Sequence, residues 1–176
     1  MVKKKVGIAG YGIIGRRRRQ NIDKNPYLQT VAVCDQKFEN DTALEDGLKC
    51  FSNYQHLLEE PLDVLFVSMP NYMAPEVTIA GLERGMHVFC EKPPGRNVAD
   101  VENVFQVKQK YPKLHLKYGF NHRYHDSVKD ALEIVRSGKL GKVVNIRGIY
   151  GKSIISPFNK TWRSKRKYAG GGILLD

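Results

Sequence analysis

Gly7-Ile-Ala-Gly10-Tyr-Gly12-Ile-Ile-Gly15 carries the pattern GxGxxG at the end of an apolar run. The run over 4–9 predicts a strand, and the residues over 13–24 have the spacing of a helix. Such glycines permit a tight turn, let backbone amides approach a pyrophosphate and let the helix pack on the strand. The phosphates then meet the positive end of the helix dipole. The stretch predicts a dinucleotide-binding turn formed by Gly10, Tyr11, Gly12, Ile13, Ile14 and Gly15.

An acidic residue follows the next apolar run at the distance expected for a ribose contact. Residues 30–34 predict a strand, and Asp35 comes about 20 residues after the last glycine of the turn. A carboxylate there accepts a hydrogen bond from the 2′-hydroxyl of NAD and repels the 2′-phosphate of NADP. We therefore expect NAD, with NADP left open because Lys37 lies nearby. The alternative interpretation is that Asp35 is a solvated turn residue.

Strand and helix patterns alternate through the first 120 residues, which is typical of βαβ units. Near-continuous apolar strands indicate a parallel sheet with helices on both faces. The fold class we expect over 1–120 is therefore α/β, with a Rossmann-type doubly wound parallel sheet. The remaining predicted strands are 63–68, 86–90 and 114–120, and the remaining predicted helices are 39–47, a short one that includes Tyr54 and Leu58, 74–84, and one that begins after Asn97 and stops at Tyr111.

The pattern changes after Phe120. A helix is predicted over 126–136, and residues 142–150 alternate as in a strand with one wetter face, which is typical of an antiparallel sheet. We expect residues 121–176 to be the beginning of a second, α+β domain. Because one antiparallel strand cannot form an independent sheet, we also expect the chain to stop within that domain.

Composition narrows the class of protein. No stretch approaches the roughly 18 apolar residues of a membrane helix, and the start Met-Val-Lys-Lys-Lys is not a secretory signal. We therefore expect a cytoplasmic protein without a membrane partner. The three cysteines and five histidines have no metal-like spacing, so we predict no metal and reduced, buried thiols at Cys34, Cys50 and Cys90.

The net charge of +11 comes entirely from the second half of the chain. Residues 1–90 hold 11 basic and 11 acidic side chains, whereas residues 91–176 hold 18 and 7. This asymmetry favours an anionic substrate or a nucleic acid. A basic solvated surface, or a face that contacts further protein, explains it equally well.

Ligands of a doubly wound sheet bind outside the carboxyl ends of the strands. Besides the glycine turn and Asp35, these ends carry Ser68, Pro70 and Asn71, and then Glu91-Lys92-Pro93. A lysine held between a carboxylate and a rigid proline could donate or relay a proton beside a substrate hydroxyl. By itself, Lys92 could equally be a surface charge.

The run Arg16 to Arg19 begins the first predicted helix, and four successive positions cover every helix face. Arg18 lies between Ile14 and Ile22 on the inward face. One arginine, Arg16, could reach a phosphate. The alternative is that the alkyl stems of the run extend around the helix to solvent.

Six motifs follow one another in a specific order: GYGIIG, MPN, HVFCEKP, YGFNHRYH, SGKLGKVVNIRG and GGGILLD. In this order they resemble the Gfo/Idh/MocA family of NAD(P)-dependent oxidoreductases, which act mostly on sugars, cyclitols and nucleotide sugars. The resemblance covers essentially the whole chain. It implies an enzyme that transfers a hydride between NAD(P) and a hydroxyl carbon of such a substrate.

The resemblance also implies roles for single residues. Lys92 lies beside the nicotinamide and the reacting carbon in the family, as a proton-relay or orienting residue, and Glu91 and Pro93 shape its turn. Asn71 contacts the cofactor near the nicotinamide ribose, close to Ser68 and Pro70. Arg123 belongs to a segment that lines the substrate cleft.

A further family motif, Asp-x-Gly-x-His, supplies an aspartate that binds substrate and a histidine that is the general acid/base. Asp176 matches the aspartate and is the last residue, so the histidine is not in this sequence. Ala74 stands where many relatives place another histidine. The alternative function is therefore a nonenzymatic dinucleotide-binding module or an inactive fragment.

The basic, aromatic stretch 158–168 has the composition of a nucleic-acid patch. In the family, however, a loop at this place borders the substrate. We therefore expect Trp162 and Arg163 to contact a small-molecule substrate, such as an anionic sugar or a nucleotide sugar, and no nucleic acid to bind. For a full-length protein the resemblance implies a homo-oligomer.

Overall fold

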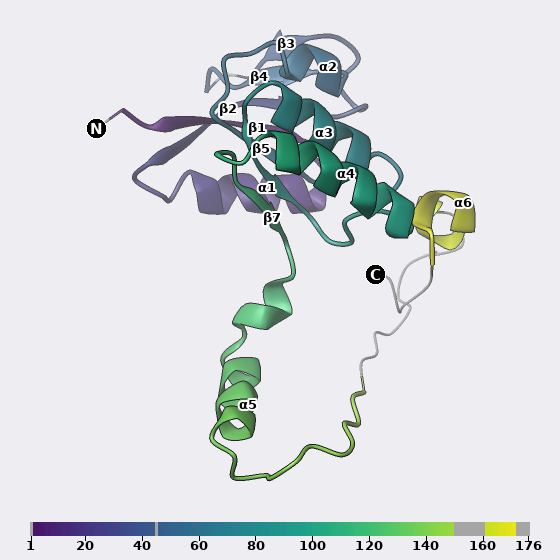
Figure 1. Ribbon diagram of the computed structural model, residues 1–176. Helices are drawn as coiled ribbons and strands as arrows, with labels where there is room; N and C mark the ends of the chain where they lie inside the picture. Colours follow the sequence, from purple (N-terminus) through teal and green to yellow (C-terminus); the bar gives the residue numbers. More distant parts are fainter. Residues whose placement is uncertain (1, 45, 150–160, 172–176) are drawn as a thin grey trace. The chain divides into compact units, whose positions relative to one another are not determined.

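The computed structural model describes residues 2–44, 46–149 and 161–171. In these residues seven strands form one sheet in the order β3-β4-β2-β1-β5-β6-β7 (Figure 1). The strands are β1 (Lys4–Ala9), β2 (Leu28–Cys34), β3 (Thr42–Ala43), β4 (Lys49–Phe51), β5 (Val64–Val67), β6 (His87–Cys90) and β7 (Leu116–Tyr118).

Neighbouring strands run parallel throughout the sheet except for β3, which runs antiparallel to β4. The chain winds outward from β1 through β2, and later returns to the other side of β1 with β5. This reversal is the switch point at which ligands of doubly wound sheets bind. The predicted Rossmann-type fold is confirmed.

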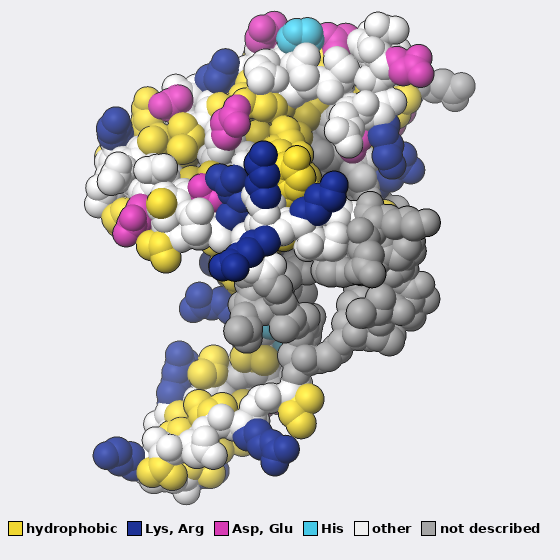
Figure 2. Space-filling model, turned by 90° about the vertical axis from the view of Figure 1, so that its right-hand side faces the viewer, with side chains coloured by type: hydrophobic (Ala, Val, Ile, Leu, Met, Phe, Trp, Pro, Cys, Tyr) yellow, Lys and Arg dark blue, Asp and Glu magenta, His cyan; other side chains and the backbone are white. Residues whose placement is uncertain are grey.

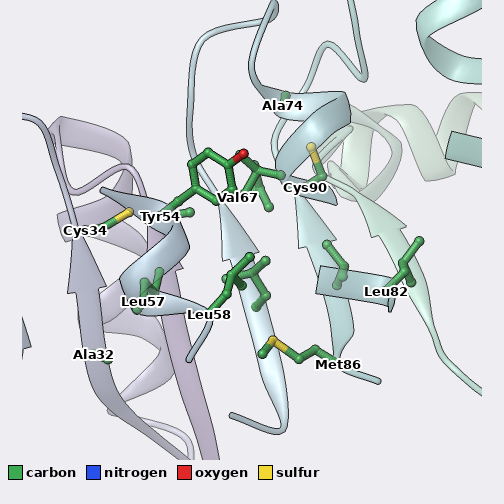
Figure 3. Packing of buried hydrophobic residues seen from close by; sticks show 14 of the residues in the cluster. Ala32, Cys34, Tyr54, Leu57, Leu58, Val67, Ala74, Leu82, Met86 and Cys90 are labelled. Carbon is green, nitrogen blue, oxygen red and sulfur yellow. The ribbon is translucent and has the colours of Figure 1, made fainter. Parts of the chain in front are cut away.

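Helices cover both faces of the sheet (Figures 1 and 3). On one face Ile22 of α1 (Ile13–Ile22) packs with Val6, Ile8 and Val33. The other face is covered by α2 (Tyr54–Leu57), α3 (Ala74–Glu83) and α4 (Val98–Lys110), which bury Leu57, Val77, Leu82 and Val104 completely. Burial of each such side chain contributes about 1.5–3 kcal/mol of transfer free energy. The sheet edge that carries the loops is therefore supported by a well-packed core.

Several predicted boundaries are confirmed. The predicted strand over 4–9 and the predicted helix over 126–136 have the bounds of β1 and α5 (Asp126–Arg136). Asn97 caps α4 by accepting a hydrogen bond from the backbone N–H of Asp100. The three cysteines are buried and unpaired, as predicted.

The predicted helix over 39–47 is wrong. Thr42 and Ala43 form β3, and the chain then turns back into β4. The Leu44 N–H donates to the Leu48 carbonyl at 2.9 Å, and Gly47 adopts a φ of 78°. Because glycine enters this left-handed conformation without steric cost, the Asp46-Gly47 pair favours a hairpin turn over a continuous helix.

Contacts divide the chain into two compact units, one made of Met1–Gly119 with Trp162–Asp176 and the other of Phe120–Thr161. This grouping differs from the predicted one, which placed all of 121–176 in a second domain. The segment with η3 (Trp162–Ser164) and α6 (Arg166–Ala169) packs on the first unit. Gly170 lies so close to Arg96 that an added Cβ would be 2.3 Å from the Arg96 carbonyl oxygen.

The second unit contains η1 (Asn121–Tyr124) and α5. The apolar side of α5 is partly exposed, with 45% of Leu132 and 42% of Val135 accessible to solvent. The described residues 142–149 form no strand, so the predicted strand over 142–150 is wrong for them. A strand needs neighbours that take up its backbone hydrogen bonds, and the described part of this unit offers none.

Candidate functional site

Backbone hydrogen bonds join the turns at the carboxyl ends of neighbouring strands. The Gly10 N–H donates to the Cys34 carbonyl at 2.9 Å, and the Ser68 N–H donates to the Ala9 carbonyl at 2.7 Å. One strand further, the Glu91 N–H donates to the Val67 carbonyl at 2.8 Å. The glycine turn and the turns after β5 and β6 therefore begin side by side at one edge of the sheet.

The three glycines of the GxGxxG pattern have different surroundings. Gly10 has a φ of 90°, and an added Cβ would be 2.4 Å from the Ser68 carbonyl oxygen. A Cβ on Gly15 would be 2.0 Å from the Gly10 carbonyl oxygen. At Gly12 an added Cβ would meet no atom within 4 Å. Gly10 and Gly15 thus close the turn, whereas Gly12 leaves open space above it.

The amino end of α1 is suited to an anion. Gly12 is the N-cap, so no side chain caps the first N–H groups, and the first turn contains no acidic residue. Free N–H groups and the helix dipole together attract phosphate. The open space over Gly12 and the uncapped helix end fit the pyrophosphate of a dinucleotide.

Asp35 lies at the end of β2, half-buried. Its Oδ1 accepts a hydrogen bond from the backbone N–H of Lys37 at 3.1 Å, and its own N–H donates to the Phe51 carbonyl at 3.1 Å. The carboxylate is therefore fixed within a turn. Lys37 contacts the Asp35 carboxylate through its backbone N–H.

Tyr11 is part of an aromatic and basic group that the sequence did not reveal. Its ring stacks on Phe38, with centroids 6.4 Å apart, and Arg19 Nη1 donates to its hydroxyl at 3.0 Å. Arg16, considered above as a phosphate ligand, lies over the Tyr11 ring at 5.7 Å. Ile13, also among the predicted cofactor contacts, is 79% exposed.

Asn71 is buried and joins two segments of the first unit. Its Nδ2 donates to the carbonyl of Ala169 at 2.9 Å, and the rings of Tyr72 and Tyr168 meet at 4.9 Å. In the structure Asn71 thus anchors the segment that follows residue 161, a contact that sequence reasoning missed. Nearby, Ser68 Oγ is buried without a hydrogen-bond partner among the described residues.

The turn after β6 carries Glu91, Lys92 and Pro93. Lys92 is half-buried, Pro93 is buried, and the peptide bond between them is cis. Arg18 Nε and Nη2 both contact Glu91 Oε1. The inward position of Arg18 on its predicted helix was a signal for such a contact, but it did not identify the partner.

The predicted substrate residues are distributed over both units. Arg163 lies over the ring of Trp162 at 4.6 Å in the first unit. Arg123 is exposed in η1 of the second unit, and Asp176 lies outside the described residues. The structure therefore brings together the glycine turn, Asp35 and the turns after β5 and β6.

Burial explains the state of two cysteines at this edge. It raises the pKa of the Cys34 thiol and that of the Cys90 thiol to about 12. Both thiols therefore stay protonated near neutral pH and do not act as nucleophiles. In the described ranges, no three His, Cys, Asp or Glu side chains gather as metal ligands would.

A hollow of about 290 Å³ lies elsewhere on the first unit. Its lining includes Lys5, Gln29 and Thr30, which belong to the beginnings of β1 and β2. The hollow is therefore separate from the edge where the strands end.

A family model described as an oxidoreductase family with an NAD-binding Rossmann fold matches residues 4–120. The chain belongs to this Gfo/Idh/MocA family. The predicted resemblance is confirmed, and the residues that meet at the sheet edge lie within the matched part. Within the described residues, no helix has both the length and the apolar character that crossing a bilayer requires.

Members of the Gfo/Idh/MocA family that resemble this chain include two curated dehydrogenases. Levoglucosan dehydrogenase of Pseudarthrobacter phenanthrenivorans is 27% identical over 162 residues, and inositol 2-dehydrogenase of Salmonella typhimurium is 30% identical over 165 residues. The alignments cover 90% and 89% of this chain, but 39% and 48% of the relatives. The chain thus spans less than half the length of these two proteins.

Among solved structures of the family, scyllo-inositol dehydrogenase from Lactobacillus casei, with bound NAD(H) and scyllo-inositol, matches with a TM-score of 0.69 and 26% identity. The match covers 79% of this chain and 42% of that one.

Proposed function

We propose that this chain forms the cofactor-binding part of an NAD-dependent dehydrogenase that oxidises a ring hydroxyl of a cyclitol or sugar. One observation carries the proposal: the glycine turn, open above Gly12, and the Lys92 turn begin at the same sheet edge. Family membership supports the chemistry. The named substrates of the inositol and levoglucosan dehydrogenases support the substrate class.

Different residues of the chain would bind different parts of the cofactor. The N–H groups at the start of α1 would hold the pyrophosphate, and Asp35 would accept a hydrogen bond from the adenosine ribose. Ser68, Pro70, Asn71 and Glu91 border the nicotinamide half. We assign NAD rather than NADP because a fixed carboxylate at Asp35 repels a 2′-phosphate.

Lys92 performs the proton chemistry at the substrate hydroxyl. Bound NAD⁺ supplies the acceptor for the hydride that leaves the carbinol carbon. As that carbon becomes a carbonyl, the hydroxyl must lose its proton, and Lys92 Nζ would orient the oxygen and relay the proton to solvent water. Lys92 is half-buried, and it follows β6 directly after Glu91.

Substrate contacts are assigned to Trp162, Arg163, Arg123 and Asp176. Trp162 and Arg163 form a stacked cationic surface, followed by Lys165, Arg166 and Lys167. Figure 2 shows one face on which Lys and Arg side chains gather. These features favour an anionic sugar or a nucleotide sugar as substrate.

We also propose a cytoplasmic protein, because three free, buried thiols suit a reducing compartment. For the whole protein we propose a homo-oligomer, as the family resemblance implies.

The test combines cofactor binding with turnover in the whole protein. We expect Lys92→Ala to bind NADH as tightly as the wild type and to lose NAD⁺ reduction with inositols and sugars. Turnover that survives in Lys92→Ala would contradict the role of Lys92. If the wild type binds NADH but none of the inositols and sugars tested reduces NAD⁺, this result would instead support the nonenzymatic binding module.

A further inference from the structure

Arg18 and Glu91 connect α1 to the end of β6 across 73 residues of sequence. Two nitrogens of the guanidinium contact a single carboxylate oxygen, Glu91 Oε1. The Arg18 side chain is 28% exposed and that of Glu91 is 16% exposed, so water screens this ion pair only in part. Hydrogen bonds between two charged, partly desolvated groups are the stronger kind in proteins.

An aromatic platform fixes the guanidinium from a second side. Arg18 Cζ lies 4.9 Å from the centre of the Phe89 ring, and Phe89 stacks on Phe66 with centroids 4.9 Å apart. Phe89 belongs to β6 and Phe66 to β5. The arginine is thus held against the sheet by stacking as well as by charge.

The Glu91 carboxylate is confined on its other side. A Cβ added to Gly119 would be 2.8 Å from Glu91 Oε2, so the glycine leaves just enough room for the carboxylate. The Glu91 N–H is bonded to the Val67 carbonyl. Glu91 is therefore fixed by its backbone, by Arg18 and by the end of β7, and Lys92 is the next residue in the chain.

We propose that Arg18 is a positioning residue that acts through Glu91 on the Lys92 turn. α1 begins at the open glycine turn, so the ion pair sets the nicotinamide end of the cofactor site in place relative to its pyrophosphate end. This inference rests on the proposed function, because that function places the Lys92 turn beside the nicotinamide. Without Arg18, Glu91 becomes an unpaired and largely buried charge, and the turn must move to solvate it.

The test compares two ligands that share the pyrophosphate but differ at the nicotinamide end. NADH and ADP-ribose are titrated into the 176-residue chain by calorimetry. In Arg18→Met we expect NADH binding to weaken about tenfold, as for a lost charged hydrogen bond, and ADP-ribose binding to change less than about twofold. General damage to the fold would weaken both ligands alike.

Three further variants keep the test sharp. Glu91→Gln, which preserves shape, should show the same selective loss, and it carries the test if Arg18→Met does not fold. Arg18→Lys should recover part of the NADH affinity, because it restores the charge but not the planar fork. The double variant Arg18→Met/Glu91→Gln should be no worse than Arg18→Met, since both changes break one interaction.

Arg17→Met is the matched control, because it removes the same charge from an exposed position of the same helix. It should leave both affinities within about twofold of the wild type. Equal losses for NADH and ADP-ribose in Arg18→Met and Glu91→Gln, or no loss in either variant, would overturn the positioning role and leave the proposed function intact. A wild-type chain that binds neither ligand would overturn the proposed function itself, and this role with it.

Discussion

The Cα of Gly15 lies so close to Gly10 that an added Cβ would stand 2.0 Å from the Gly10 carbonyl oxygen. Three residues earlier, Gly12 faces space that holds no atom within 4 Å of such a Cβ. These two glycines of one motif therefore have different structural roles. Gly15 closes the turn, and Gly12 keeps the approach to the helix end clear.

Substitution of these glycines should separate stability from cofactor binding. Gly12 has a φ of −75°, which alanine adopts freely. We expect Gly12→Ala to keep the urea midpoint of the wild type while NADH affinity falls about tenfold or more. We expect Gly15→Ala to lose about 1–3 kcal/mol of unfolding free energy, because its methyl group meets backbone. Equal stability of the two variants in urea would count against this division.

Asp35 should control the choice between NADH and NADPH. Asp35→Ser removes the charge that repels a 2′-phosphate, and we expect the affinity ratio to shift toward NADPH by about tenfold, or about 1.4 kcal/mol. The control is Asp41→Ser, which removes an equal charge from an exposed carboxylate that binds His56. The prediction fails if calorimetry gives the same ratio for Asp35→Ser and for the wild type.

Asn71 should hold the segment around α6 to the rest of the first unit. Asn71→Asp has nearly the same shape but replaces the donor to the Ala169 carbonyl with a second acceptor, which costs about 1–3 kcal/mol for a buried group. We expect trypsin to cut faster at Lys165 to Lys167, as followed by mass spectrometry. Cleavage at the wild-type rate would show that the bond does not anchor the segment.

The pair Arg96 and Asp100 should make stability depend on pH. Hydrogen bonds from the Arg96 side chain, at 2.9 and 3.1 Å, hold the pKa of the Asp100 carboxyl below its ordinary value. A lowered pKa in the folded state stabilises the protein above the unfolded pKa, and this stabilisation is lost as pH falls through the folded pKa.

Asp100→Asn should accordingly cost about 1–2 kcal/mol in urea at about pH 7, and clearly less at about pH 3. Urea unfolding curves of the wild type and of Asp100→Asn are measured at both pH values. A stability difference that does not change with pH would mean that charge is not what Asp100 contributes.

Local patterns predicted most of the sheet and the glycine turn. A strand that runs into GxGxxG and then a helix has few structural solutions, so β1, the turn and α1 followed from adjacent residues. The predicted helix over 39–47 is wrong because Gly47 and the pairing of β3 with β4 favour a hairpin. Such pairing is a tertiary effect that overrides local propensity.

These local patterns could not predict the contacts that assemble the site. Arg18 and Glu91 are 73 residues apart, and Asn71 and Ala169 are 98 residues apart. The sequence showed that Arg18 faces inward and that Glu91 ends a strand, but periodicity gives no partner. The folded arrangement of α1, the strands and α6 brings these residues into contact.

We propose that a dinucleotide binds at the turn that Gly12 leaves open, and calorimetric titration of NADH into the wild-type chain and into Gly12→Ala measures this binding. We predict saturable binding at one site in the wild type, and strongly weakened binding in a Gly12→Ala variant that is equally well folded. Absence of binding to the wild type, or equal binding to both proteins, would contradict the claim.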